Sequence, residues 1–432
     1  MADQLTATVI GGGIAGLASA ASLLQAGWKV TVLERAPAFT EVGAGVAITR
    51  NGMTALDVIG AGDIVRTAGH MTRTAGFQDQ RGRWVLRVPD TPTDQDSPTW
   101  LCAIHRQRLH AALLQTVDGA DLMTGAQVIA VEPGAPTAAP AAVTWISKTG
   151  EQVIESDLVV AADGVRSTVR GHLFPGIQPE YGGATSWRAV IEDSEMVDDR
   201  FIAVWGAGAE FGALRISANE VYWYGYFQSP ANSVYDDELG TARAMFAHWP
   251  ALVTDTVAAT TASQLMRHDV YHLPKGLPTY VRGRVVMAGD AAHAFLPTMG
   301  QGVATSLEDG ACVGRLIAQP VNQGAALAPA LAAYDRARQP RCRKIARQAV
   351  MIGRLGAHVG GGWRQSVRNT LLRLTPAGLF TNTDFATQLV GWTPPSGPSP
   401  ITHSPAQRQD HERDNSSTAR SKTSEPPRRQ RK

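Results

Sequence analysis

The chain has 432 residues and 44% hydrophobic content, enough for one large core or two coupled domains. Its formal net charge is +2. Residues 393–432 hold eight Lys/Arg against four Asp/Glu, a net of +4, so the rest sums to −2 and gives no reason to expect a nucleic-acid partner. Three scattered cysteines predict neither a disulfide framework nor a metal site. With no apolar run of ~18–20 residues and no signal-peptide pattern, we expect a cytoplasmic protein without integral membrane association.

The first elements are predicted to form a βαβ unit. Leu5–Gly11 is a short apolar run that predicts a strand, and the Ala/Leu-rich Ile14–Gln25 predicts a helix ended by Gly27. Lys29–Leu33 predicts a second strand with Glu34 at its end. The next predicted elements are a surface loop at Pro89–Pro98, a helix at Arg106–Gln115 and a strand at Glu155–Ala162.

The composition changes near residue 176. Trp and Tyr are concentrated in residues 176–266, in short runs separated by Gly and Asn that predict an antiparallel sheet. A basic amphipathic segment, Trp363–Leu374, is expected to pack on the protein body or on a second subunit, with a membrane surface as the alternative. The remaining predictions are a buried strand at Val285–Gly289, a helix start and helix over Gly300–Ile317, and one or two amphipathic helices over Leu327–Leu355.

A glycine-rich turn joins the first predicted strand to the first helix. Gly11-Gly12-Gly13-Ile14-Ala15-Gly16 has the G-x-G-x-x-G spacing, whose glycines permit a tight turn and the close approach of a pyrophosphate. Amides at the helix N-terminus then face the phosphates. Glu34, 23 residues after Gly11, is placed to accept hydrogen bonds from ribose hydroxyls, which disfavours a 2′-phosphate. The motif therefore predicts a dinucleotide site that is not for NADP, without separating FAD from NAD.

Two further strand–turn–helix junctions carry an acid. Ala161–Ser167 contains Asp163, and Gly289–His293 contains Asp290 and is followed by Gly300-Gln301-Gly302. Because Asp290 follows a buried strand, its carboxylate is expected to reach a ribityl or ribose hydroxyl. The glycines around Gln301 open a helix whose amides face a developing anion, such as the charge near N1 and C2=O of a reduced flavin.

In order and spacing, these three motifs resemble the dinucleotide fingerprint, the DG motif and the GD motif of single-component, class A flavoprotein monooxygenases. That family includes aromatic hydroxylases, FAD-dependent urate hydroxylase and zeaxanthin epoxidase-like enzymes. The resemblance covers roughly residues 6–345. It implies an α/β fold, with a Rossmann-type, glutathione-reductase-like FAD-binding domain, an interleaved antiparallel β-sheet substrate domain and C-terminal helices. The expected boundaries are 1–175 for the first part of the FAD domain with a small insertion around 73–98, 176–268 for the substrate domain, 269–392 for the second part and the C-terminal helices, and 393–432 for a disordered basic tail.

The resemblance also implies which residues would hold FAD. At the adenosine and pyrophosphate end they are Gly11, Gly13, Ile14, Ala15, Gly16, Glu34, Arg35, Arg106 and Val128. Around the flavin and its ribityl chain they are Gly45, Val46, Ala47, Asp163, Asp290, Pro297, Gly300, Gln301 and Gly302. Asp290 is expected to bind the ribityl chain, and Pro297 to lie beside the ring where oxygen reacts.

The aromatic middle region supplies the expected substrate residues. In Val221–Tyr226 the side chains of Tyr222, Tyr224 and Tyr226 share one face, and tyrosines both pack against a flat substrate and hydrogen-bond to it. Placement against the urate-hydroxylase-like branch puts Arg188 and Tyr222 at the substrate. We predict Arg188, Tyr222 and Tyr224 as substrate-binding residues, and Arg188, Tyr222 and Pro297 as catalytic residues. His293, at a strand-to-helix turn, is expected to be structural.

The resemblance implies an enzyme that takes electrons from NADH or NADPH, bound only transiently, and oxygen from O2. Through a flavin C4a-hydroperoxide it would hydroxylate or epoxidise a small aromatic or polycyclic substrate, as a monomer or homodimer. Two alternatives stay open at this point. One is a flavin enzyme without oxygenation; a halogenase is disfavoured because the chain lacks a Trp-x-Trp-x-Ile motif. The other is an FAD-binding protein with a non-catalytic role.

Overall fold

The computed structural model describes residues 4–39, 43–88, 99–192, 197–356, 358–375 and 389–395. By its internal contacts the chain forms one compact unit over Met1–Gly397. The predicted loop at Pro89–Pro98 and the tail beyond residue 395 lie outside the described residues, and the finer division into domains stays a prediction.

A six-stranded sheet carries the glycine-rich turn. The apolar runs predicted near the N-terminus form its central strands, and α1 (Ile14–Gln25) follows between them, as predicted, and is ended by Gly27 at φ 84°. Pairing is parallel except at one edge, where β17 runs antiparallel to β18. In spatial order the strands are β17 (Val281–Arg282), β18 (Val285–Met287), β11 (Leu158–Ala161), β1 (Thr6–Ile10), β2 (Lys29–Glu34) and β7 (Asp121–Thr124).

The strand predicted at Glu155–Ala162 is divided between two sheets. Its first residues belong to β10 (Gly150–Ser156), which pairs with β9 (Ala141–Ser147) and then β8 (Gln127–Glu132) in a separate three-stranded sheet. Asp157 marks the break, because its carboxylate accepts a hydrogen bond from the Thr6 amide at 3.0 Å. Only the residues after Asp157 enter the six-stranded sheet, as β11.

A nine-stranded sheet forms the other half of this unit. The antiparallel sheet predicted over residues 176–266 is present, and residues 45–105 add further strands, including two from the predicted insertion. All pairs are antiparallel except β13 with β4. In spatial order the strands are β16 (Met266–His272), β12 (Glu180–Glu192), β15 (Glu220–Gln228), β14 (Ala209–Ser217), β13 (Arg200–Trp205), β4 (His70–Asp79), β6 (Trp100–His105) and β3 (Gly45–Thr49), with β5 (Trp84–Arg87) beside β4.

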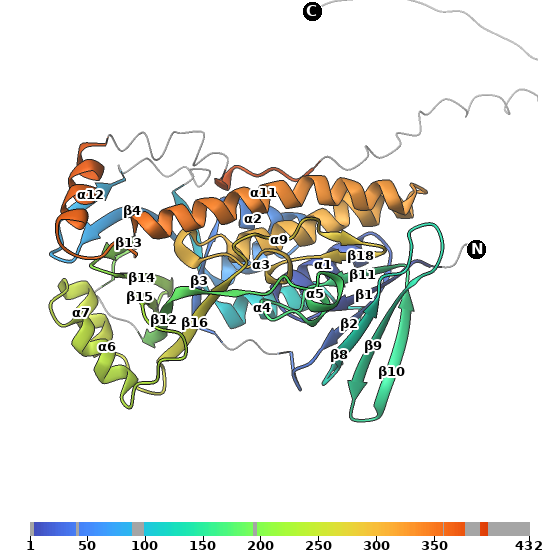
Figure 1. The fold of residues 1–432 in the computed structure, drawn as a ribbon, viewed down its shortest axis with the longest axis horizontal. Coiled ribbons are helices and arrows are strands. Elements are labelled where there is room, and N and C mark those ends of the chain that lie inside the picture. Colours follow the sequence, from blue (N-terminus) through green and yellow to red (C-terminus); the bar gives the residue numbers. More distant parts are fainter. Residues whose placement is uncertain are drawn as a thin grey trace, which may run out of the picture. The chain divides into compact units, whose positions relative to one another are not determined.

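Two separate cores stabilise these sheets. The larger one packs helices on the six-stranded sheet, and a second one lies on the outer face of the nine-stranded sheet, where Trp187, Phe211 and Trp223 are buried against α6 (Glu238–Phe246) and α7 (Ala251–Ala258). Figure 1 shows α6 and α7 at the lower left and strands β8 to β10 at the lower right. The other helical elements before residue 323 are α2 (Arg50–Val58), α3 (Gly62–Ala68), α4 (Arg106–Gln115), α5 (Thr168–Leu173), α8 (Asp290–His293), the 3-10 turn η1 (Pro297–Met299), α9 (Gly302–Cys312), the π-helical η2 (Val313–Ala318) and α10 (Gln319–Asn322).

Two helices complete the C-terminal part of the described chain. The segment predicted as one or two helices is a single helix, α11 (Leu327–Leu355), which continues through Pro340 and crosses the top of Figure 1. The predicted amphipathic segment is α12 (Trp363–Leu374). Among the described residues, no helix is both long and apolar enough to cross a membrane.

Candidate active site

One cavity of about 920 Å³ is lined by residues of both large sheets. One end is bounded by the glycine-rich turn, Glu34 and Val128, and the other by Tyr222 and Phe201. A volume at the top of the roughly 300–1,000 Å³ range of ligand pockets suits a large cofactor together with a second, smaller molecule.

The turn after β1 is tight and closely packed. Gly11 adopts φ +103°, and a Cβ there would collide with the carbonyl oxygen of Ala162. A Cβ on Gly16 would overlap the Gly11 carbonyl oxygen, so Gly16 lies under the turn and lets α1 approach the strand. Gly13 and the first residues of α1 line the cavity. Gly11 and Gly16 therefore serve the tight turn and the close packing that the motif predicted.

Glu34 is held at the end of the cavity that the glycine-rich turn bounds. Its Oε2 accepts the Gly12 amide at 2.7 Å, and its Oε1 accepts the Ala36 amide at 2.8 Å. The carboxylate is thereby fixed at the end of β2 and borders the cavity with Arg35. This placement fits a ribose, whose hydroxyls donate to such a carboxylate.

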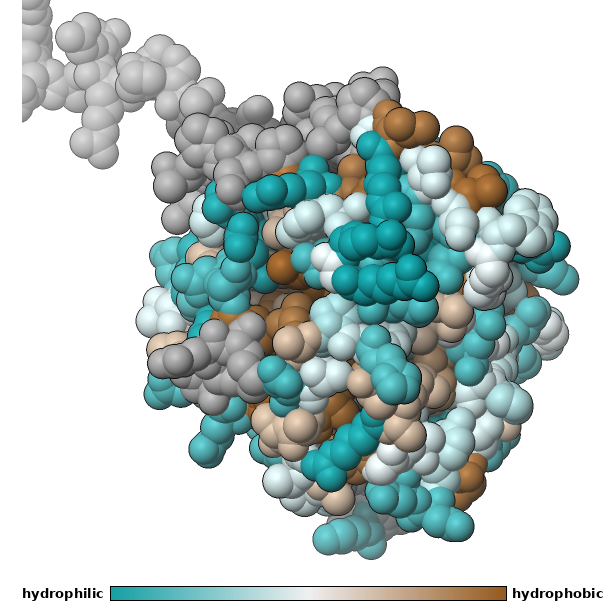
Figure 2. All heavy atoms as spheres, turned by 90° about the vertical axis from the view of Figure 1, so that its left-hand side faces the viewer, coloured by the Kyte–Doolittle hydropathy of each residue, from teal (hydrophilic) through white to brown (hydrophobic). Residues whose placement is uncertain are grey.

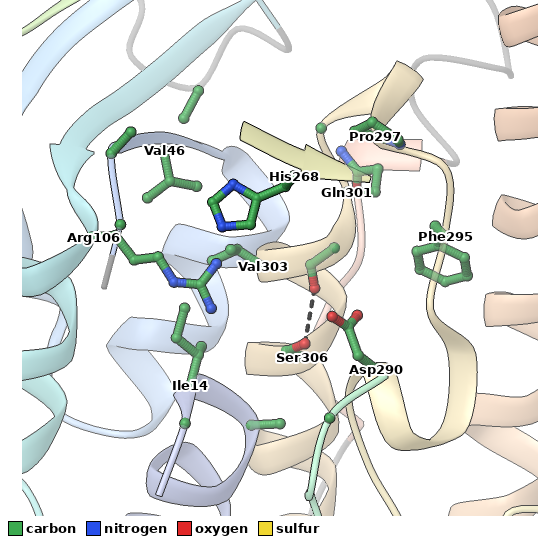
Figure 3. Close-up of a pocket in the computed structure, with 18 of the residues that line it drawn as sticks. Ile14, Val46, Arg106, His268, Asp290, Phe295, Pro297, Gln301, Val303 and Ser306 are labelled. Atoms are coloured by element: carbon green, nitrogen blue, oxygen red, sulfur yellow. Dashed lines mark hydrogen bonds between the residues drawn. The ribbon is translucent and has the colours of Figure 1, made fainter. Parts of the chain in front are cut away.

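The turn after β18 and the start of α9 line another part of the cavity. A Cβ on Gly300 or Gly302 would have no neighbour within 4 Å, so both positions open directly onto the cavity. Asp290 is exposed and lines the same space, with no hydrogen-bond partner for its carboxylate among the described residues. Figure 3 shows Arg106, His268 and Asp290 pointing into the cavity from different elements. The open glycines and the available carboxylate fit a flavin with its ribityl chain.

A buried polar network fixes Gln301 from behind. The Gln301 side chain accepts from Asn51 Nδ2 at 3.1 Å and donates to Thr49 Oγ1 at 3.2 Å. Asn51 Nδ2 also donates to Glu308 Oε1 at 2.6 Å, and Glu308 in turn accepts from Arg338 at 2.6 Å. Because every member has a partner, the network holds the N-terminus of α9 in one position.

His293 joins this network through Asp309 and does not line this cavity. Its Nε2 lies 2.5 Å from Asp309 Oδ2, and both side chains are buried. His293, Asp309 and Cys342 place ligand-type atoms within 4.8 Å of one another, a cluster that spacing along the chain did not reveal. The Arg338 guanidinium already contacts Asp309 Oδ1 at 2.6 Å and Cys342 Sγ at 3.6 Å, which disfavours a second cation there.

One face of the nine-stranded sheet forms the opposite wall. Tyr222, Tyr224 and Tyr226 line the cavity from β15, as their alternation predicted, whereas Trp223 is buried on the other face. Arg188 of β12 lies across from Tyr224 in the ladder. Two residues before Arg188 on the same strand, Ser186 pairs with His268 of β16.

Two of the tyrosines differ in their bonding. Tyr224 donates its hydroxyl to Glu210 Oε1 at 2.6 Å, and Gly212, which lies between them, leaves room for the ring. Burial and the Glu210 carboxylate raise the pKa of Tyr224 well above its usual value, and burial raises the pKa of Glu210. The Tyr222 hydroxyl has no hydrogen-bond partner among the described residues and is therefore available to a ligand.

His268 and Arg188 are the other polar groups of this wall. His268 is exposed to the cavity, and its partial removal from solvent lowers its pKa below 6.5; the positive charges of Arg188 and Arg106 lower this pKa further. His268 is therefore a neutral imidazole at neutral pH and can accept a hydrogen bond. Arg188 Nε donates to Ser186 Oγ at 3.3 Å and supplies the fixed cation.

The predicted site residues therefore converge on one cavity. Arg188, Tyr222 and Tyr224 line it, as do all the predicted FAD residues except Gly16. Sequence reasoning missed His268 and Glu210, since each is a lone polar residue in a strand, and it missed the far wall. That wall consists of Thr74, Phe77, Leu101, Phe201, Ala203, Leu214 and Met266.

Comparison with known proteins decides the class of this site. Residues 4–349 match the FAD binding domain family. The chain belongs to this family. It is 32% identical over 380 residues to aurachin C monooxygenase/isomerase of Stigmatella aurantiaca, covering 87% of this chain and 95% of that protein. It is 31% identical over 383 residues to 2-heptyl-3-hydroxy-4(1H)-quinolone synthase of Pseudomonas aeruginosa, covering 86% and 94%.

A solved structure agrees with these relatives. The crystal structure of Klebsiella pneumoniae HpxO with FAD and uric acid superposes with a TM-score of 0.78 at 26% identity, covering 89% of this chain and 96% of that chain. Together these matches establish an FAD-dependent monooxygenase of the class A type with a Rossmann-like FAD domain. FAD is its cofactor, and NAD(P)H and O2 are the co-substrates typical of the class.

Proposed function

We propose that this FAD-dependent monooxygenase hydroxylates a heteroaromatic ring that carries a hydrocarbon substituent, with a 2-alkyl-4-quinolone as the substrate class. The observation that carries the proposal is the apolar far wall of the cavity. Phe77, Phe201 and Leu214 line the end remote from the glycine-rich turn. A wall of this kind favours an alkyl chain by about 0.8 kcal/mol per buried CH2 group. The aurachin and heptyl-quinolone enzymes among its relatives support the same choice.

Three side chains are proposed to orient the ring. Arg188 would donate to a ring carbonyl, and the available Tyr222 hydroxyl would donate to the same edge or accept from it. The neutral His268 would accept a proton or hydrogen bond from the ring N–H, which raises electron density at the carbon to be hydroxylated. We assign substrate binding to Arg188, Tyr222 and His268, and to Tyr224 the role of holding Glu210 away from the ring.

The cofactor end is proposed to work through position and charge. When bound, FAD accepts hydride from NAD(P)H and activates O2. Glu34 would hold the adenosine ribose, Arg106 the phosphates and Asp290 the ribityl chain. The amides of Gly300, Gln301 and Gly302 at the start of α9 would stabilise negative charge on the ring, with Pro297 beside it. The three cysteines are buried and free, which supports our proposal of a cytoplasmic location.

The test is turnover by the FAD-loaded protein in air with NADH or NADPH and one of three ligands. These are 2-heptyl-4(1H)-quinolone, the same ring without the alkyl chain, and urate. We expect the heptyl compound to stimulate NAD(P)H oxidation most and to gain one oxygen atom by mass spectrometry. Hydroxylation of urate with no response to the heptyl compound would overturn the proposed substrate class.

A variant of the far wall distinguishes the contribution of the alkyl chain to binding from that of the ring. Phe201→Ser is expected to raise KM for the heptyl compound about tenfold, which corresponds to fewer than two buried CH2 groups. The KM of the alkyl-free ring should stay unchanged. Val234→Ser is the matched control, since Val234 is 86% exposed and far from the cavity lining.

A further inference from the structure

Helix α12 is attached to the protein by its polar face. Gln365, Arg368 and Asn369 are the buried residues of this helix. Arg368 Nη1 donates to the carbonyls of Leu355 at 3.1 Å and Gly356 at 3.0 Å, and its guanidinium lies 5.2 Å from the Trp205 ring centre. Arg373 adds an ion pair with Asp79 at 2.8 Å. These contacts fix which side of α12 faces outward.

The outward side is apolar, the reverse of the usual arrangement for a surface helix. Trp363, Val367 and Leu371 recur at intervals of four residues and are 73%, 48% and 62% exposed. Figure 2 faces the end of the molecule that carries α12 and shows apolar side chains at its upper edge beside strongly hydrophilic ones. With the end of α11, the apolar ridge consists of Met351, Leu355, Trp363, Val367, Leu371 and Leu374.

The charge around the apolar ridge has one sign. Between Asp335 and Asp384 the sequence has nine arginines and one lysine and no acid, but Arg338, Arg341 and Arg373 are held in ion pairs and Arg368 faces inward. Arg354 and Arg364 are exposed beside the ridge. The acid that contacts α12 from the neighbouring strands, Asp79, is only 3% exposed and is neutralised by Arg83 and Arg373. The ridge is thus an apolar surface with Trp at one end and cations at its sides.

We propose that the apolar ridge docks on the surface of an anionic lipid bilayer, with α12 lying in the interface. Leucines and tryptophan flanked by arginine are the pattern of helices that bind this interface without crossing it. A second copy of the chain fits less well, because a two-fold contact brings each patch onto itself and would face arginine with arginine. This inference goes beyond the proposed function and does not depend on the substrate.

The apolar ridge lies on the substrate side of the molecule. Arg368 covers Trp205, whose ring centre is 4.4 Å from that of Phe77, and Phe77 lines the apolar end of the cavity. Two aromatic rings thus connect the inward, polar face of α12 to this end of the cavity. Docking on a bilayer would therefore bring this end of the cavity, rather than the adenosine end, toward the lipid.

The experiment is sedimentation of the full-length, FAD-loaded protein with vesicles. We expect it to pellet with phosphatidylcholine vesicles that contain phosphatidylglycerol, and at least about tenfold less with phosphatidylcholine alone. Leu371→Gln with Leu374→Gln is expected to weaken binding to the anionic vesicles at least about tenfold. The matched control is Val153→Gln with Val234→Gln, because these valines are 60% and 86% exposed elsewhere, and it should bind like the wild type.

Three outcomes would overturn the proposal. The first is that the wild type fails to pellet with anionic vesicles. The second is that the leucine variant binds them as well as the wild type does, which would make another surface, such as the basic C-terminal residues, responsible. The third is that the only effect of the leucine variant is to convert a dimer into a monomer in sedimentation velocity. The flavin absorbance of each variant checks that it is folded, and no step uses turnover, so the result is independent of the substrate assay.

Discussion

Arg338 of α11 and Asp309 of α9 form an ion pair in which both side chains are fully buried, with Nε and Oδ1 2.6 Å apart. The same guanidinium binds Glu308, and Glu308 leads through Asn51 to Gln301 at the flavin end of the cavity. Arg338 therefore supports, through these side chains, the position of Gln301 at the N-terminus of α9.

Removal of this arginine should leave two buried carboxylates without the cation that they share. We expect Arg338→Met to lower the free energy of unfolding by about 3–5 kcal/mol and to reduce FAD content. Urea unfolding and flavin absorbance measure both effects. Arg336→Gln, on an exposed position of the same helix, should change stability by less than about 0.5 kcal/mol. Equal stability of the two variants would contradict the structural role of Arg338.

Acid should destabilise the protein through Asp309. Burial alone would raise the pKa of this carboxyl, but the charges of His293 and Arg338 lower it to about 2 from an ordinary 3.8. A depressed pKa contributes stability above the unfolded value, and that contribution is lost as the pH falls from about 4 to about 2. At about 1.4 kcal/mol per unit, roughly 2–3 kcal/mol should be lost. Urea unfolding across this range, compared with Asp309→Asn, checks it; an equally steep pH dependence in the variant would refute the assignment.

The protonation of His268 should determine how kcat/KM falls at low pH, the acid limb of the pH profile. Its pKa lies below 6.5 because of partial desolvation at the cavity wall and the charges of Arg188 and Arg106, and the proposed role needs the neutral form. We therefore expect kcat/KM to rise with pH through a pKa below 6.5 and then to level off. In His268→Asn this limb should disappear while FAD content is unchanged. A limb that persists at the same pH would assign it to another group.

Removal of the hydroxyl should affect stability at Tyr224 and substrate binding at Tyr222. Tyr224→Phe removes the 2.6 Å hydrogen bond to buried Glu210, so we expect a loss of about 1–3 kcal/mol of unfolding free energy. Tyr222→Phe removes a hydroxyl without a partner in the described structure, so stability should not change and KM should rise. Thermal unfolding and steady-state kinetics on both variants make the comparison, and the reverse pattern would exchange their roles.

Glu34 should determine FAD affinity. Glu34→Ala removes a charged acceptor for the ribose, worth about 1.5–3 kcal/mol, so the Kd for FAD should rise roughly ten- to a hundredfold. The measurement is titration of the apoprotein with FAD by flavin fluorescence. Glu132→Ala, at the exposed end of β8, is the control and should leave the Kd unchanged. An unaltered Kd in Glu34→Ala would place the ribose elsewhere.

The cofactor half was predictable because local rules determine it. The turn from Gly11 to Gly16, the acid that ends β2 and the junction at Asp290 each need particular residue types at fixed spacing, and the helix over Ile14–Gln25 has the predicted bounds. The strand break at Asp157 was not predictable, because it depends on a hydrogen bond to Thr6, 151 residues away.

The substrate half was only partly predictable. Alternation placed the three tyrosines on one face, but the far wall comes from strands whose pairing spans most of the chain, such as β13 with β4. The network around Arg338 joins residues of four helices that have no common motif, namely α2, α8, α9 and α11. The orientation of α12 also departs from the rule that apolar faces turn inward, since Arg368 and Arg373 bind inside and leave the leucines exposed.

The nine-stranded sheet has a core of its own, with Trp187, Phe211 and Trp223 on the face away from the cavity. Side chains on the cavity face, such as Leu214 and Phe201, can therefore be exchanged without touching that core or the glycine-rich turn. For evolution, and for directed libraries, this makes the substrate wall a replaceable surface on a constant redox scaffold.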